Sequence, residues 1–65
     1  EPLSYTLAAL RELPDGVTLV QVNARVPMML LPRLEELGFA YDVQKLAEDR
    51  VHVYMRRTGS AAARP

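Results

Sequence analysis

Apolar positions at the start of the chain follow the three–four spacing of an amphipathic helix, which we place at residues 3–13. Side chains at this spacing stack on one face of a helix. Ser4 is the expected N-cap, with Leu3 packing against Ala8. The helix is expected to end at Pro14-Asp15-Gly16, because proline cannot continue the hydrogen-bond ladder and glycine accepts a positive φ. The apolar face comprises Leu3, Leu7, Ala8 and Leu10.

The run from Val17 to Val22 is β-branched and almost continuously apolar, which predicts a strand. A loop at residues 23–26 leads to a second helix that ends at Leu37, before Gly38. If this helix begins near Met28 or Met29, Pro32 falls at the end of its first turn and costs little. If it begins earlier, Pro32 should kink it. Its apolar stripe comprises Leu30, Leu31, Leu34 and Leu37.

Two runs with strict alternation of apolar and polar residues, 39–44 and 51–56, predict a hairpin. Both apolar sets must share one face, so the numbers of paired residues must sum to an even value. A three-residue loop, Ala47-Glu48-Asp49, satisfies this condition if Asp49 adopts the left-handed conformation. The expected pairs are Tyr41 with Met55, Val43 with Val53, Asp42 with Tyr54, and Gln44 with His52.

The order helix, strand, helix, strand, strand predicts an α+β fold. We expect a two-layer α/β sandwich, with two helices packed on one face of a small mixed sheet. The chain between the first two strands is long enough for a helical crossover, so these strands should be parallel. Residues 1–57 form a single domain, and residues 58–65, which lack an apolar period, form a flexible tail.

The composition excludes several classes of function. The chain has 65 residues, no cysteine, and eight basic residues balanced by eight acidic ones. It therefore lacks disulfides, thiolate metal sites and thiol nucleophiles, and no bulk charge attracts nucleic acid or a membrane surface. No apolar run approaches the length of a membrane span and no signal peptide is visible, so we expect a cytoplasmic protein.

Catalytic chemistry is not expected, because one histidine and scattered hydroxyls do not supply a nucleophile, a base and an orienting group. His52 is placed on the open face of the sheet, beside Gln44 and near Asp42 and Tyr54. A metal site needs three or four converging ligands, so His52 is interpreted as a surface side chain. We expect no cofactor and no metal. Among the tyrosines, Tyr41 should be buried and Tyr54 exposed.

The loop before the second helix is a candidate ligand or anion site, formed by Asn23, Arg25, Pro27 and Met28. Free N–H groups at a helix N-terminus favour anions, and Arg25 adds positive charge. The alternative is a plain connector, since every strand-to-helix junction has this geometry. Met28 and Met29 are adjacent, so one should face inward and the other is a candidate interface residue.

A second candidate surface is basic and lies on the last strand. It comprises Tyr54, Arg56 and Arg57. Sheets that bind nucleic acid usually carry several stacking aromatic residues, and this one offers a single tyrosine. A solvated strand end is the alternative interpretation.

Four segments of the chain match one known pattern: Leu13–Leu19, Val22-Asn23, Pro27, and Leu34–Gly38. Together they resemble a cysteine-free branch of the TusA-like (SirA-like) superfamily, which consists of small domains of unknown function often found beside hemerythrin-like domains. The resemblance covers residues 1–57 and implies a two-layer fold with strand order one, two, four, three. It departs from TusA itself in having no reactive cysteine, which a persulfide needs.

The first strand of the TusA-like fold would precede Glu1, so we expect the chain to be N-terminally incomplete and to begin inside a larger domain. Without that strand, Val17, Leu19 and Gln21 lie on an exposed apolar edge of the sheet. Such an edge pairs readily with another chain. It is our candidate interface.

Three functional hypotheses follow. The first is a non-catalytic interaction or accessory domain that is part of a larger protein or self-associates, so that its partner is another protein or a second copy. The second is a sulfur-relay or small-ligand carrier without its own thiol. The third is weak nucleic-acid binding through the basic last strand.

Overall fold

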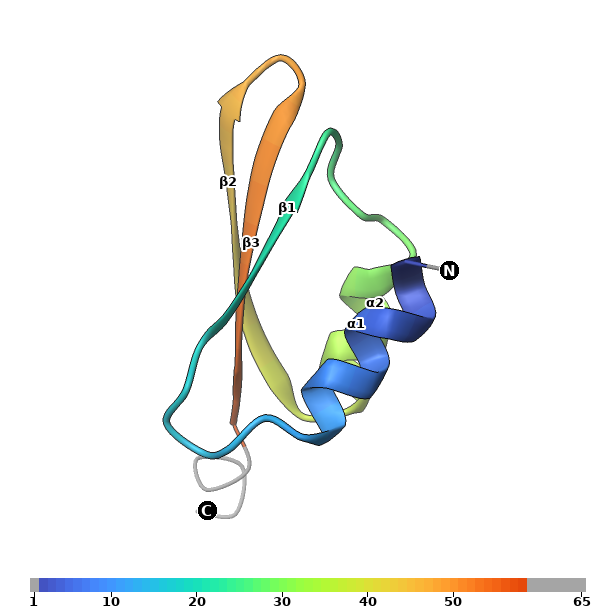
Figure 1. Ribbon diagram of the computed structural model, residues 1–65, viewed down its shortest axis with the longest axis vertical. Coiled ribbons are helices and arrows are strands. Elements are labelled where there is room, and N and C mark those ends of the chain that lie inside the picture. The colour runs from blue at the N-terminus through green and yellow to red at the C-terminus, as the bar shows by residue number, and fades with distance from the viewer. Residues whose placement is uncertain (1, 59–65) are drawn as a thin grey trace.

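The computed structural model describes residues 2–58, so the expected tail lies outside the described residues apart from Thr58. Two helices cover one face of a twisted three-stranded sheet (Figure 1). This arrangement confirms the predicted α+β fold, with helices on one face of the sheet. The elements are α1 (Pro2–Arg11), β1 (Leu19–Asn23), α2 (Leu30–Glu36), β2 (Phe39–Ala47) and β3 (Arg50–Arg57).

The sheet has the strand order β1-β3-β2, and both pairs of neighbours are antiparallel. The first two strands do run in the same direction, as expected for a helical crossover, but β3 lies between them. The sheet is therefore antiparallel and not mixed, because the hairpin inserts its second strand next to β1. The TusA-like resemblance implies this same order for the last three strands of that fold.

The hairpin has the predicted register: Tyr41 pairs with Met55, Val43 with Val53, Asp42 with Tyr54, and Gln44 with His52. The predicted turn is wrong. Ala47 pairs with Arg50, which leaves a two-residue turn, and a bulge lies between Lys45 and Ala47. Leu46 is the extra residue of this bulge. It shifts the pairing by one residue, so that the two apolar sets still share one face although the turn has only two residues. No residue other than glycine has a positive φ within residues 2–58, so Asp49 is not left-handed.

Helix α1 begins at Pro2 and ends at Arg11, one or two residues earlier than predicted at both ends. Proline suits the first turn of a helix, where its missing N–H is not needed, and Ser4 lies inside the helix instead of capping it. The buried face also differs. Leu10 and Thr6 are buried, whereas Ala8 is exposed.

Helix α2 follows a turn in which the N–H groups of Leu30 and Leu31 donate to the Pro27 carbonyl, at 2.9 and 3.4 Å. Pro32 therefore falls within the first turn of α2 and leaves the helix unbroken. The helix ends at Glu36, one residue earlier than predicted, with Leu37 as its C-cap. The glycine that follows is as predicted: Gly38 has φ +83°, and its N–H donates to the Glu35 carbonyl. Leu37 is 51% exposed and does not belong to the buried stripe.

The core lies between the two helices and one face of the sheet. It joins both helices to β2 and to the central strand β3. Tyr41 is half-buried, not buried, and its hydroxyl donates a hydrogen bond of 3.2 Å to Glu35. The buried apolar side chains are Leu10, Leu30, Leu34, Phe39, Val51, Val53 and Met55.

Candidate interaction site

Strand β1 forms one edge of the sheet, as the sequence predicted. It pairs with β3 from Leu19↔Met55 to Asn23↔Val51, and no strand within residues 2–58 pairs with its other side. In Figure 1, β1 crosses in front of β3 and β2, so this open edge faces the viewer. Val17 does not belong to the strand, because its N–H is held by the Pro14 carbonyl in the preceding turn, at 3.3 Å.

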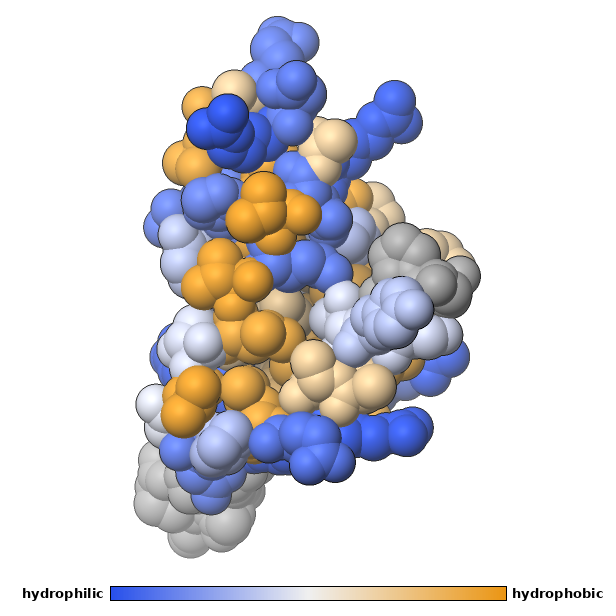
Figure 2. All heavy atoms as spheres, in the orientation of Figure 1, coloured by the Kyte–Doolittle hydropathy of each residue, from blue (hydrophilic) through white to orange (hydrophobic). Residues whose placement is uncertain are grey.

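The side chains of β1 leave this edge apolar and uncharged. Val20 and Val22, which are 44% and 62% exposed, lie on the face away from the helices, and Val17, in the turn before the strand, is 43% exposed. Figure 2 shows apolar side chains gathered along the course of β1. No residue from Gly16 to Ala24 is charged. Edge strands usually carry charges or proline that block further pairing, and this edge has neither.

On the opposite face of β1, two amide side chains form a chain of hydrogen bonds to α1. Asn23 Nδ2 donates to Gln21 Oε1 at 2.8 Å, and Gln21 Nε2 donates to the hydroxyl of Thr6 at 2.5 Å. Thr6 is 8% exposed, so the link is anchored in the interior. Sequence reasoning missed Thr6, although it lies three residues after Leu3 and four before Leu10, on the same helix face.

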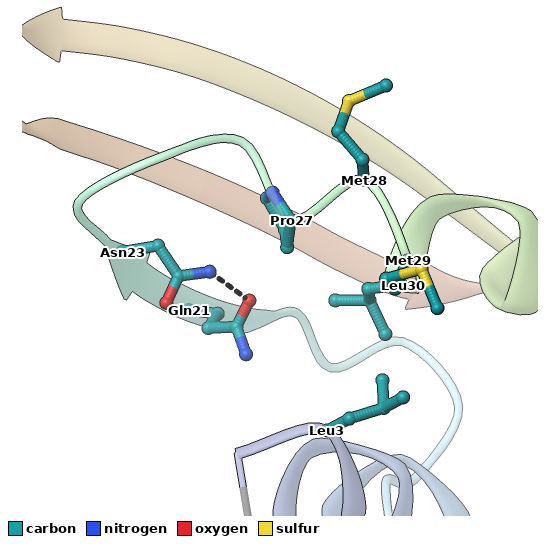
Figure 3. Close-up of a pocket in the computed structure, with 7 residues that line it drawn as sticks. All are labelled: Leu3, Gln21, Asn23, Pro27, Met28, Met29 and Leu30. Atoms are coloured by element: carbon teal, nitrogen blue, oxygen red, sulfur yellow. Dashed lines mark hydrogen bonds between the residues drawn. The ribbon is translucent and has the colours of Figure 1, made fainter.

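These amides border a pocket of about 230 Å³ at the junction of β1, α1 and the turn before α2. Figure 3 shows Leu3, Gln21, Asn23 and Leu30 pointing toward this space from three separate elements. Among residues 2–58, no charged side chain lines the pocket. Its walls consist of Leu3, Gln21, Asn23, Pro27, Met28, Met29 and Leu30.

The pocket joins two groups of residues that the sequence suggested separately. Gln21 comes from the predicted interface edge, whereas Asn23, Pro27 and Met28 come from the predicted ligand loop. Arg25 does not line the pocket, and the N–H groups of the first α2 residues already donate to Pro27. The two features that the sequence analysis linked to anion binding, Arg25 and free N–H groups at the start of the helix, are therefore not part of this pocket.

Met28 and Met29 are both largely exposed, at 70% and 76%. The sequence predicts that one of them faces inward, and this prediction is wrong. Both lie in the turn before α2 and not on the helix itself, so helical spacing does not constrain them. In Figure 3 the Met28 side chain points away from the pocket that this turn borders.

The predicted basic surface is not a single surface. Arg57 lies on the helix-facing side of β3, where its guanidinium donates to the carbonyls of Leu13, at 2.8 Å, and of Leu10 and Arg11, both at 3.0 Å. It also lies over the Phe39 ring, 5.1 Å from the centroid. Tyr54 and Arg56 alternate with it in the strand; Tyr54 faces the other side of the sheet, and Arg56 is exposed.

The open face carries the histidine where the sequence placed it. His52 Nδ1 lies 3.4 Å from the Tyr54 hydroxyl, and the two rings meet edge-on. On the neighbouring strand, Gln44 Nε2 donates to Asp42 at 3.3 Å. Tyr54 is half-buried and not exposed, because His52 packs beside it. Across residues 2–58, no three His, Cys, Asp or Glu side chains converge as metal ligands would.

Neither α1 nor α2 is long and apolar enough to cross a bilayer, and no other helix occurs among the described residues. The fold and the site together define a small α+β domain with an uncharged open strand edge and a neutral pocket beside it. The chain belongs to the DUF2249 family of uncharacterized conserved proteins, whose model matches residues 1–57. Neither the curated proteins nor the solved structures yielded a similar protein.

Proposed function

We propose that this domain is a non-catalytic interaction module that binds an extended segment of a protein along the open edge of β1. The observation that carries the proposal is the uncharged edge strand, with two exposed valines, whose outer side has no strand partner within residues 2–58. An added strand would hydrogen-bond to the outer backbone groups of β1 and would cover Val20 and Val22.

The chemistry at the site supports binding over catalysis. The polar side chains of the pocket are two amides, Gln21 and Asn23, which do not act as acids or bases near neutral pH. His52 lies on the other face of the sheet, beside Tyr54. A sulfur relay is less well supported, because the chain has no thiol.

Nucleic-acid binding also has less support than strand binding. Among the three residues predicted for it, Arg57 donates to three backbone carbonyls and packs on Phe39. Its guanidinium is therefore not free to contact a phosphate, and Tyr54 lies on the opposite face of the sheet.

The strand order further supports a relationship to the TusA-like superfamily. In that fold the first strand pairs next to the strand that corresponds to β1. The partner segment therefore comes from another protein, from a second copy, or from a longer polypeptide that includes this domain. All three would use the same edge.

The proposal is tested by selecting peptides of about nine residues, the upper range of natural strand lengths, from a displayed random library. Bound peptides should protect the backbone amides of β1 that point away from β3, which belong to alternate residues within 19–23, from hydrogen exchange, because these groups gain partners. The double variant Val20→Lys/Val22→Lys should weaken binding by about tenfold or more, equivalent to about 1.4 kcal/mol, because charged edge side chains oppose strand addition.

The matched control is Leu37→Lys/Leu46→Lys, which makes the same change at two exposed leucines away from β1. It should bind the selected peptides as the unmodified domain does. Sedimentation velocity of the domain alone identifies a second copy as the partner if a dimer forms that the β1 double variant loses. Peptides that protect other strands, or that bind both double variants equally, would overturn the proposal.

A further inference from the structure

We propose that the pocket beside β1 selects one side chain of the bound strand, and that this side chain is uncharged and of the size of leucine, methionine or phenylalanine. The inference rests on the proposed function and adds the specificity of the same site. It follows from the position of the pocket, its volume and the absence of charge in its walls.

The position follows from sheet geometry. Gln21 and Asn23 project from β1 toward the helix layer and line the pocket (Figure 3). Side chains on one face of neighbouring strands lie about 5 Å apart. A residue of an added strand that faces the helices would therefore lie directly against these amides, at the mouth of the pocket.

The volume sets the size of the selected side chain. A cavity of about 150 Å³ in a protein interior can hold benzene, so a pocket of about 230 Å³ admits a branched aliphatic, thioether or phenyl side chain. Alanine would leave most of the space unfilled.

The lining sets the charge. None of the seven residues around the pocket is ionisable. A lysine or aspartate side chain placed there would lose water without gaining a counter-ion, which costs free energy. The Gln21 amide is held by Thr6 and Asn23, so its polar atoms are already paired.

The test is a change of specificity. Asn23→Asp preserves the size of the side chain and places one carboxylate at the pocket. Gln21 can rotate its amide so that Nε2 donates to this carboxylate, and the Thr6 hydroxyl, which both donates and accepts, then donates to Oε1. We therefore expect the variant to fold with an unchanged melting temperature, within the range usual for surface substitutions.

Libraries of displayed peptides are selected separately against the unmodified domain and the Asn23→Asp variant. The unmodified domain should enrich leucine, methionine or phenylalanine at one peptide position. The variant should enrich lysine or arginine at that same position, and a lysine peptide should bind it about tenfold more tightly than it binds the unmodified domain. Gln44→Glu makes the same amide-to-carboxylate change on β2 and should leave the preference unchanged.

The outcomes separate the two proposals. If peptides bind at β1 but show no preference at any position, or if Asn23→Asp leaves the preference unaltered, the pocket does not select a side chain and the proposed strand binding stands. If small apolar molecules bind the pocket but peptides do not, this inference fails with the proposed function. If no peptide loses affinity in the Val20→Lys/Val22→Lys variant, the proposed function itself fails.

Discussion

Arg57 joins the last strand to the C-terminal end of α1. The last carbonyls of a helix have no partner within the helix, and the Arg57 guanidinium donates to those of Leu10 and Arg11 and to the following Leu13. Asp15 lies 3.7 Å from the guanidinium but is 87% exposed, so this ion pair contributes little. The stabilising contacts are the backbone hydrogen bonds and the Phe39 ring.

We predict that Arg57→Ala lowers the free energy of unfolding by about 2 kcal/mol, because hydrogen bonds from charged groups are worth about 1.5–3 kcal/mol. The carbonyls of Leu10, Arg11 and Leu13 lose the guanidinium as a donor, and the Leu10 carbonyl keeps the Leu13 N–H. Urea unfolding measures the change. Arg56→Ala removes the same side chain from the neighbouring, exposed position and should change stability by less than about 0.5 kcal/mol. Equal effects of the two substitutions would contradict the role given to Arg57.

At the scale of the elements, Tyr41 connects β2 to α2 through its hydrogen bond to Glu35. Partial burial raises the pKa of the Tyr41 hydroxyl above its usual value of 10.0, and the hydrogen bond to Glu35 and the negative charge of that carboxylate raise the pKa further. A raised pKa means that the folded state favours the protonated hydroxyl. Its contribution to stability is therefore complete below pH 10 and is lost as the pH rises through the pKa of the folded state.

We predict that the unmodified domain loses stability relative to Tyr41→Phe when the pH is raised above 10, and that the two have a constant difference below that pH. Urea unfolding at a series of pH values checks this. Tyr5→Phe is the control, because Tyr5 is 75% exposed and its removal should leave the pH profile unchanged. If both variants have the profile of the unmodified domain, Tyr41 is not the group that titrates.

The hairpin and the helices differ in how far they followed from the sequence. The register of β2 and β3 was predictable, because alternation fixes which residues share a face and one buried face excludes a slip by one residue. The turn was not, because a bulge at Leu46 and a three-residue loop satisfy the same condition on residue numbers. Likewise, the glycine that follows α2 was predictable, whereas the predicted cap at Ser4 was wrong and α1 begins at Pro2.

At the scale of the whole fold, residues 2–58 contain a core of seven buried apolar side chains that holds two helices on three strands. A chain of this length is expected to have a free energy of unfolding of about 3–10 kcal/mol. Leu34 is fully buried where α2 meets the sheet, in contact with the rest of the core. Stability therefore depends on few side chains.

We predict that Leu34→Ala costs about 2–5 kcal/mol, the usual range for a leucine removed from a close-packed core, and leaves the domain only marginally folded. Urea or thermal unfolding followed by circular dichroism measures this loss. Leu46→Ala shortens a leucine that is 51% exposed on β2 and should have a small effect. If the Leu34→Ala variant unfolds cooperatively and with the same midpoint as the unmodified domain, this core does not hold the helices to the sheet.

The composition of the candidate site could not be predicted from the sequence, because its residues are distant along the chain and meet only in the fold. The sequence indicated an apolar edge near Gln21 and a loop near Asn23 as two separate sites, and the structure makes them two walls of one pocket. Thr6 and Leu3 complete this site from α1, at the other end of the sequence order. Arg57 was predicted to belong to a binding surface, but in the structure its side chain contacts the C-terminal end of α1.

The sequence by itself determined the elements, the face of each strand that is buried and the pairing of the hairpin. These depend on the spacing of apolar side chains along the chain, and that spacing is written in the order of the residues. The tertiary structure decided which side chains of different elements meet. The path of α1 across the sheet brings Thr6 to Gln21 and the end of the helix to Arg57, and it follows from the packing of the whole core.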